Sequence, residues 1–88
     1  MVRRRVIVSG DVQGVFFREG FRRQAQAHGV VGWVRNRGDG TVEAVLQGEP
    51  AAVEQVVSWA HTGPPHATVA DIEVNTEEPT AERGFTVR

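Results

Sequence analysis

The stretch Val6–Arg18, VIVSGDVQGVFFR, joins a β-branched run to a segment with the periodicity of a helix. Gly10 and Gly14 lie four residues apart in the connecting loop, and glycine permits backbone that turns N–H groups inward. Arg18 stands where the helix should begin, beside the positive end of the helix macrodipole, and a cation is unfavourable there unless an anion lies between the two. The stretch therefore indicates an oxyanion site, phosphate first, with Arg18 as its charged arm. An ordinary strand-to-helix turn with a solvated Arg18 is the alternative.

Strand and helix patterns alternate along the rest of the chain. A helix is predicted over Arg18–His28, with Gly29 as its C-terminal stop. A second helix opens at Gly48–Pro50, where proline is tolerated in the first turn, and ends at Gly63–Pro65. The apolar stripe of the first helix comprises Phe17, Phe21, Ala25 and His28. The predicted strands are Val6–Val8, Val30–Arg37, Thr41–Gln47, Thr68–Asn75 and a short Gly84–Val87 whose Phe85 and Val87 face inward.

This order of elements, β-α-β-β-α-β, defines the fold class. It is the split βαβ or ferredoxin-like arrangement, an α+β fold in the form of an α/β sandwich. Right-handed crossovers place the two helices on one face of an antiparallel sheet and leave the other face open to solvent or to a partner. Enzymes, RNA binders and regulatory modules share this fold, so the fold alone does not define the function.

Length and composition restrict the class of protein. The 88 residues suffice for one modest core, so residues 1–88 are expected to form a single domain. Ten basic and eleven acidic residues give a net charge of −1, which argues against a dedicated nucleic-acid binder. The absence of cysteine excludes disulfides and thiol catalysis, and no segment resembles a signal peptide or a membrane span. A cytoplasmic location is the default expectation.

Few other residues are candidates for chemistry. The only basic run, Arg3–Arg5, is expected to be a solvated strand start, because three charges are too few for a binding tail. Asn36 precedes the hairpin turn at Gly38–Gly40 and has two interpretations. An asparagine there is common turn chemistry, but its amide could also hold a water molecule and aim it at the glycine loop. No metal-ligand spacing exists among the histidines, which are His28, His61 and His66.

Two segments resemble the signatures of the acylphosphatase family. GDVQGVFFR at residues 10–18 is similar to the first signature. GWVRN at residues 32–36, followed by Gly40–Val42 and Gly48, is similar to the second, and the resemblance spans essentially the whole chain. The resemblance implies a ferredoxin-like fold and the activity of an acylphosphatase. Such an enzyme hydrolyses the carboxyl–phosphate bond of an acyl phosphate without a metal ion. The products are a carboxylate and inorganic phosphate.

The resemblance also implies roles for individual residues. Arg18 would bind the phosphoryl group, and Asn36 would orient the attacking water. Backbone N–H groups would form a phosphate cradle, whose residues are Gln13, Gly14, Val15, Phe16, Phe17 and Arg18. Asp11 beside this loop would weaken anion binding unless it points outward. No general base is among the matched residues, so the substrate's own phosphate oxygens are expected to accept the proton of the water.

The resemblance further implies that the protein needs no cofactor and no metal. Its partners would be a small-molecule acyl phosphate and phosphate, with no nucleic acid and no membrane, and nothing demands more than a monomer. The main alternative is a non-enzymatic ferredoxin-like module. An RNA-binding module would carry stacked aromatic and basic residues on its central strands, whereas the predicted strands carry only Trp33 and Phe85. A regulatory domain that binds a small molecule stays open, and phosphate release from benzoyl phosphate distinguishes it.

Overall fold

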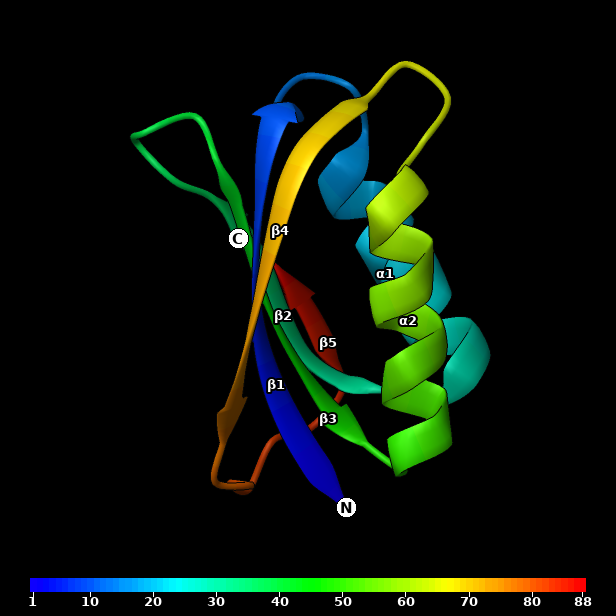
Figure 1. Ribbon diagram of the computed structural model, residues 1–88. Coiled ribbons are helices and arrows are strands. Elements are labelled where there is room, and N and C mark those ends of the chain that lie inside the picture. The colour runs from blue at the N-terminus through cyan, green and yellow to red at the C-terminus, as the bar shows by residue number, and fades with distance from the viewer.

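The strands and helices follow one another in the predicted order in a computed structural model that describes residues 1–88 (Figure 1). The strands are β1 (Val2–Asp11), β2 (Val31–Asn36), β3 (Val42–Gly48), β4 (Thr68–Glu77) and β5 (Phe85–Val87), and the helices are α1 (Phe17–His28) and α2 (Pro50–Thr62). β1 is much longer than the predicted strand Val6–Val8, while the other bounds agree within a few residues. Neither helix has the length and apolar character needed to cross a membrane.

The strands form one five-stranded sheet in the order β4-β1-β3-β2-β5. The four longer strands pair antiparallel, and both helices lie on one face of the sheet (Figure 1). The ferredoxin-like α/β sandwich predicted from the element order is therefore confirmed. β5 adds one parallel pair with β2, through hydrogen bonds from Gly32 N to Gly84 O and from Arg88 N to Val34 O, both 2.9 Å. The sheet is therefore mixed and not purely antiparallel as predicted, because β5 runs parallel to β2, its only neighbour at the edge opposite β4.

The core lies between the sheet and the two helices. Val6 and Val8, two alternate residues of β1, face the helices and are fully buried. The predicted stripe of α1 is buried except at His28, which is exposed at the end of the helix. The Trp59 ring lies 5.4 Å from that of Phe17 and 5.2 Å from that of Phe21, edge-on to both. Each such pair contributes about 0.5–1.5 kcal/mol beyond its area burial. This aromatic cluster holds the start of α1, and with it the preceding loop, against α2.

Arg3 is buried, so the prediction of a solvated strand start is wrong at this position. Its guanidinium contacts Glu77 Oε1 at 3.1 Å and also bonds to side chains of the segment 78–84. Arg5, two residues on, pairs with Glu77 at 2.6 Å and with Glu43. The reason is the position of β1 between β3 and β4, because carboxylates on both neighbouring strands reach its arginines. The sequence shows the basic run but not these partners.

Candidate active site

The loop between β1 and α1 is held against the β2–β3 hairpin by the side chain of Gln13. Its Nε2 donates to the carbonyl oxygens of Arg37 at 2.7 Å and Thr41 at 3.0 Å. Gly14 (φ 75°) and Phe16 (φ 66°) both have left-handed backbone. Successive residues in such alternating conformations turn their N–H groups toward one concave side. The loop is therefore fixed and bent in the manner of an anion-binding loop.

The first turn of α1 leaves backbone donors without partners in the helix. The first intrahelical hydrogen bond runs from Gly20 N to Phe16 O at 2.9 Å, and no side chain caps this end. The N–H groups of residues 17–19 therefore have no carbonyl partner within α1. Together with the positive end of the macrodipole, they favour an anion at this end of the helix.

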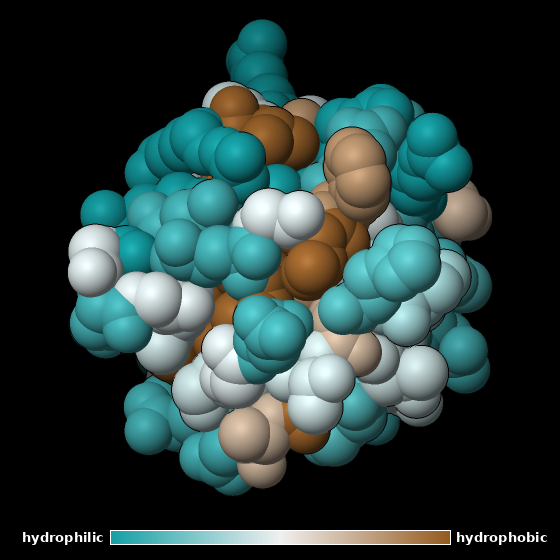
Figure 2. Space-filling view, turned by 90° about the horizontal axis from the view of Figure 1, so that it is seen from above, coloured by the Kyte–Doolittle hydropathy of each residue, from teal (hydrophilic) through white to brown (hydrophobic).

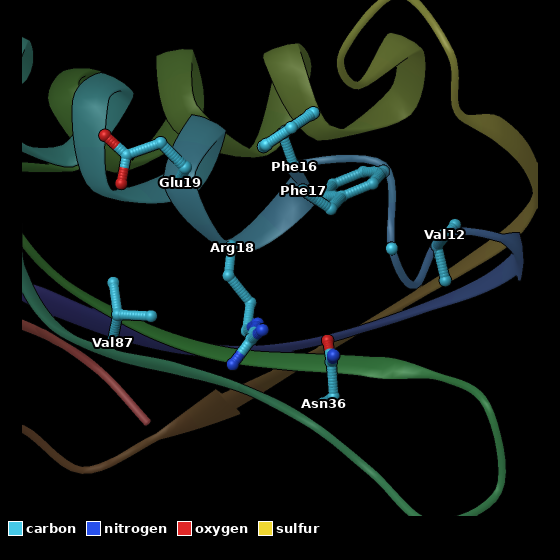
Figure 3. Close-up of a pocket in the computed structure, with 8 residues that line it drawn as sticks. Val12, Phe16, Phe17, Arg18, Glu19, Asn36 and Val87 are labelled. Atoms are coloured by element: carbon cyan, nitrogen blue, oxygen red, sulfur yellow. The ribbon is translucent and has the colours of Figure 1, made fainter.

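Arg18 and Asn36 meet in one pocket at this end of α1. Arg18 extends from α1 toward the sheet, and Asn36 rises toward it from the end of β2 (Figure 3). The pocket has a volume of about 340 Å³. Its lining residues are Val12, Gly14, Phe16, Phe17, Arg18, Glu19, Asn36 and Val87. Two residues far apart in the sequence thus face the same small volume.

Arg18 is oriented by a residue that the sequence does not single out. Its Nη1 donates to the backbone oxygen of Arg88 at 2.8 Å. Arg88 is itself held in place, because its N–H donates to Val34 O at 2.9 Å and its guanidinium lies over the Trp33 ring, 4.2 Å from the centroid. One donor of Arg18 is engaged in this contact, and the other N–H groups of its planar fork are free to bind an oxyanion.

Glu19 is a pocket residue that sequence reasoning missed. The hydrogen bond from Arg22, together with a weaker one from Arg23 at 3.3 Å, lowers the pKa of Glu19 to about 2. A general base works best when its pKa lies near the operating pH. Glu19 is therefore charged but weakly basic at neutral pH, and its charge is paired with Arg22 and Arg23. Its spacing to Arg22 and Arg23 signals an exposed helix pair, but nothing in the sequence places it at a pocket.

The loop residues named for the cradle separate into two groups. Gly14, Phe16, Phe17 and Arg18 line the pocket, whereas Gln13 and Val15 do not. The side chain of Gln13 points to the hairpin instead and braces the loop. Asp11 is exposed at the end of β1 and is not among the lining residues.

Val87 lies in the pocket rather than in the core, contrary to its predicted inward position. It is 39% exposed, while Phe85 on the same strand face packs against the core. The physical reason is the place where α1 begins. Phe85 packs against the core, but Val87 lines the pocket beside the first turn of α1 (Figure 3). Strand alternation predicts the face of a residue, and not how far the covering helix extends.

The fold and the pocket define a class: a ferredoxin-like α/β sandwich with an arginine-bearing pocket at the N-terminus of its first helix. No group of three or more histidine, aspartate or glutamate residues in the chain is arranged to hold a metal ion. The Acylphosphatase family model matches residues 4–87. The chain therefore belongs to the acylphosphatase family, hydrolases that act on acyl phosphates.

Individual relatives agree with this assignment. The chain is 58% identical over 86 residues to an acylphosphatase of Rubrobacter xylanophilus, covering 96% of this chain and 77% of the relative. It is 52% identical over 88 residues to an acylphosphatase of Roseiflexus sp., covering 99% and 95%. The crystal structure of acylphosphatase from Bacillus subtilis superimposes with a TM-score of 0.96 at 35% identity, covering 100% of this chain and 99% of that one.

Proposed function

We propose that this chain hydrolyses acyl phosphates in the pocket between α1 and β2, with Arg18 and Asn36 as its catalytic residues. The observation that carries the proposal is their meeting in one pocket beside the uncapped start of α1. An arginine fork, free N–H groups and a helix dipole bind the phosphoryl group. The side-chain amide of Asn36, which faces these groups, binds the attacking water.

Arg18 and the cradle supply the charge stabilisation that the reaction needs. Phosphoryl transfer depends mainly on positioning and on stabilising charge on the equatorial oxygens. Arg18 donates two parallel charge-assisted bonds to those oxygens, and the backbone N–H groups from Gln13 to Arg18 form the cradle around the others. Of this set, residues Gly14, Phe16, Phe17 and Arg18 line the pocket directly. The donors are held before the substrate arrives, so they need no reorganisation during the reaction.

Asn36 orients the water that attacks phosphorus. The amide accepts a hydrogen bond from the water and holds its oxygen on the side of the phosphoryl group opposite the leaving oxygen. The new O–P bond forms as the P–O bond to the acyl group breaks, and the electron pair of that bond leaves with the carboxylate. The water proton passes to a phosphate oxygen, because the pKa of Glu19, about 2, makes it a weak base. The products are a carboxylate and inorganic phosphate.

The test is phosphate release from benzoyl phosphate at neutral pH, measured with and without EDTA. We expect turnover that EDTA does not change, because Arg18 and the helix N-terminus perform the electrostatic work of a metal ion. Strong inhibition by EDTA would contradict metal independence. No turnover, together with tight binding of RNA or of a metabolite, would favour a non-enzymatic module instead.

Further features of the protein are proposed with the activity. Residues 1–88 act as a single domain and as a monomer; one copy of the chain brings Arg18 and Asn36 into the same pocket, so the proposed mechanism requires no second copy. A cytoplasmic location fits a cysteine-free chain that acts on small phosphorylated metabolites. Gel filtration at micromolar concentration tests the monomer, and a dimer peak would refute it.

A further inference from the structure

Exposed apolar side chains gather at the mouth of the pocket. Phe16 is 77% exposed, the most exposed large hydrophobic residue of the chain, and Val87 is 39% exposed. Both line the pocket that holds Arg18 and Asn36. The end of the molecule that carries the β1–α1 and α2–β4 loops shows apolar surface at its centre, bordered by hydrophilic side chains (Figure 2). A site for a bare phosphate would need no such rim.

Phe16 also belongs to a second hollow, next to the first. This groove has a volume of about 280 Å³. Its lining residues are Phe16, Glu19, Gly20, Arg23, Pro64 and Pro65. Phe16 and Glu19 are common to both hollows, so they form the wall between them. A ligand anchored by its phosphoryl group at Arg18 can therefore continue past Phe16 into the groove.

The groove is rigid before any ligand binds. Its floor is closely packed at Gly20, because a Cβ there would come within 2.5 Å of the Trp59 ring that packs against α1. A Cβ at Gly63 would lie 2.6 Å from the Phe17 ring, so the α2–β4 loop sits directly on the start of α1. Pro64 and Pro65 follow, and their rings restrict the backbone. Rigid walls reduce the ordering cost of binding.

The backbone at Phe16 is strained. Its φ of 66° lies in the left-handed region, which a bulky residue rarely adopts and which glycine or asparagine would adopt more easily. Strain at an exposed aromatic residue beside a pocket points to a function for its side chain. The ring is neither buried nor needed for the core.

We propose that Phe16 and the groove beside it bind the acyl group of the substrate, so that this protein prefers acyl phosphates with an aromatic acyl group over acetyl phosphate. The inference rests on the proposed function and names its substrate class. An aromatic ring stacks on Phe16 and against the two prolines, while a methyl group is too small to reach them. The charged groups of the groove wall, Glu19 and Arg23, pair with each other and so do not demand a charged acyl group.

The experiment compares kcat/KM for benzoyl phosphate and acetyl phosphate by phosphate release. We expect the benzoyl-to-acetyl ratio to fall about three- to tenfold in Phe16→Asn, the range expected for losing one aromatic contact. Asparagine tolerates left-handed backbone, so the loop is kept while the ring is lost. Any damage to the shared phosphate cradle lowers both values and cancels in the ratio. Phe16→Tyr retains the ring and should retain the ratio.

Val74→Ala is the matched control, because Val74 is an exposed apolar residue of β4 outside both hollows. An unchanged ratio in Phe16→Asn, or an equal fall in Val74→Ala, would overturn the inference while leaving acyl phosphate hydrolysis intact. If Phe16→Asn does not fold by circular dichroism, Pro65→Ala decides: a fall in the ratio supports the inference and an unchanged ratio overturns it. Failure of the unmodified protein to hydrolyse either substrate would overturn the proposed function itself.

Discussion

At the scale of single residues, the proposed phosphoryl ligand explains why Arg18, a cation, stands at the positive N-terminal end of α1. Its charge is unfavourable beside the positive pole of α1 in the absence of a ligand, and its contact with Arg88 O directs it toward the pocket. A phosphoryl group between the guanidinium and the helix would make both interactions favourable. The arrangement therefore predicts that Arg18 matters for activity much more than for folding.

Arg18→Ala should lower kcat/KM for benzoyl phosphate by about 10³-fold or more, the size of effect that arginines have in phosphoryl transfer. Arg18 is exposed, so the melting temperature should change little. Arg18→Lys is the control: it keeps the charge but loses the planar fork, and should recover only a small part of the rate. A folded Arg18→Ala variant with most of its activity would remove Arg18 from the mechanism.

Asn36→Ala should lower kcat by about 10²-fold, because the attacking water loses its orientation. Inhibition by inorganic phosphate should stay the same, since Arg18 and the cradle still bind the anion. Steady-state kinetics with phosphate as a competitive inhibitor separate the two effects. Asn36→Asp is a useful companion, because it adds a negative charge near the phosphoryl group and should weaken phosphate binding as well. Parallel losses of turnover and phosphate binding in Asn36→Ala would argue against a water-orienting role.

At the scale of elements, glycines set how closely strands and helices approach. Gly32 in β2 has φ 137°, and a Cβ there would overlap the backbone oxygen of Val45 on β3. β2 carries Asn36 at its end and pairs with β5 through Gly32 N, so its position determines one side of the pocket. Gly38 in the β2–β3 turn has open space around it and no positive φ.

Gly32→Ala should therefore destabilise the protein by about 2–4 kcal/mol, through overlap with the neighbouring strand and backbone strain. Gly38→Ala, in the same hairpin, should change the free energy of unfolding by no more than about 0.5–1 kcal/mol, and in the stabilising direction. Urea denaturation of the two variants measures both values. Equal stabilities would mean that β2 can move away from β3 at little cost.

At the scale of the whole molecule, an ion-pair network covers the sheet face that the helices leave open. Glu43 on β3 bonds to Arg5 of β1 and to Arg35 of β2 at 2.6 Å. Glu77 at the end of β4 bonds to Arg5 at 2.6 Å and to Arg3 at 3.1 Å. The network thus links the four longer strands across the sheet, and Arg3 extends it to the segment 78–84 that leads into β5.

This network makes stability depend on pH. Partial burial raises the pKa of Glu43, but hydrogen bonds from Arg35 and Arg5 outweigh it and leave the pKa below its usual range. The hydrogen bond from Arg5 likewise lowers the pKa of Glu77. A carboxylate with a lowered pKa in the folded state stabilises the protein above its unfolded pKa, about 4.3. That stabilisation is lost as the pH falls through the folded-state pKa.

Glu43→Gln should lower the free energy of unfolding at pH 7 by about 1–3 kcal/mol, because the side chain is only 7% exposed and two charged bonds are lost. The same variant should lose less stability than the unmodified protein between pH 5 and pH 3. Urea midpoints across this range test both statements. Glu54→Gln, at an exposed position on α2, is the control and should follow the unmodified protein. Identical pH profiles for all three would show that Glu43 does not contribute.

Much of the fold and the main elements of the site could be predicted from the sequence, because they depend on local patterns. The order of strands and helices follows from periodicities of two and of three to four residues, and these are properties of neighbouring side chains. Gly10, Gly14 and Arg18 mark the loop for the same reason, since left-handed backbone and helix polarity act within a few residues. Asn36 is different: local chemistry left it open as a turn residue, and only the resemblance to the family signatures implied that it orients water.

Only the tertiary structure decided what depends on partners distant in the chain. The burial of Arg3 depends on β4 and the segment after it, and the exposure of Val87 on where α1 begins. Arg18 faces Asn36 because β2 lies beneath the start of α1, and no local pattern specifies that neighbour. Periodicity predicts on which face of its own strand or helix each residue lies. Which other element covers that side is decided by the pairing and packing of the whole chain, and that is where the pocket and its apolar rim arise.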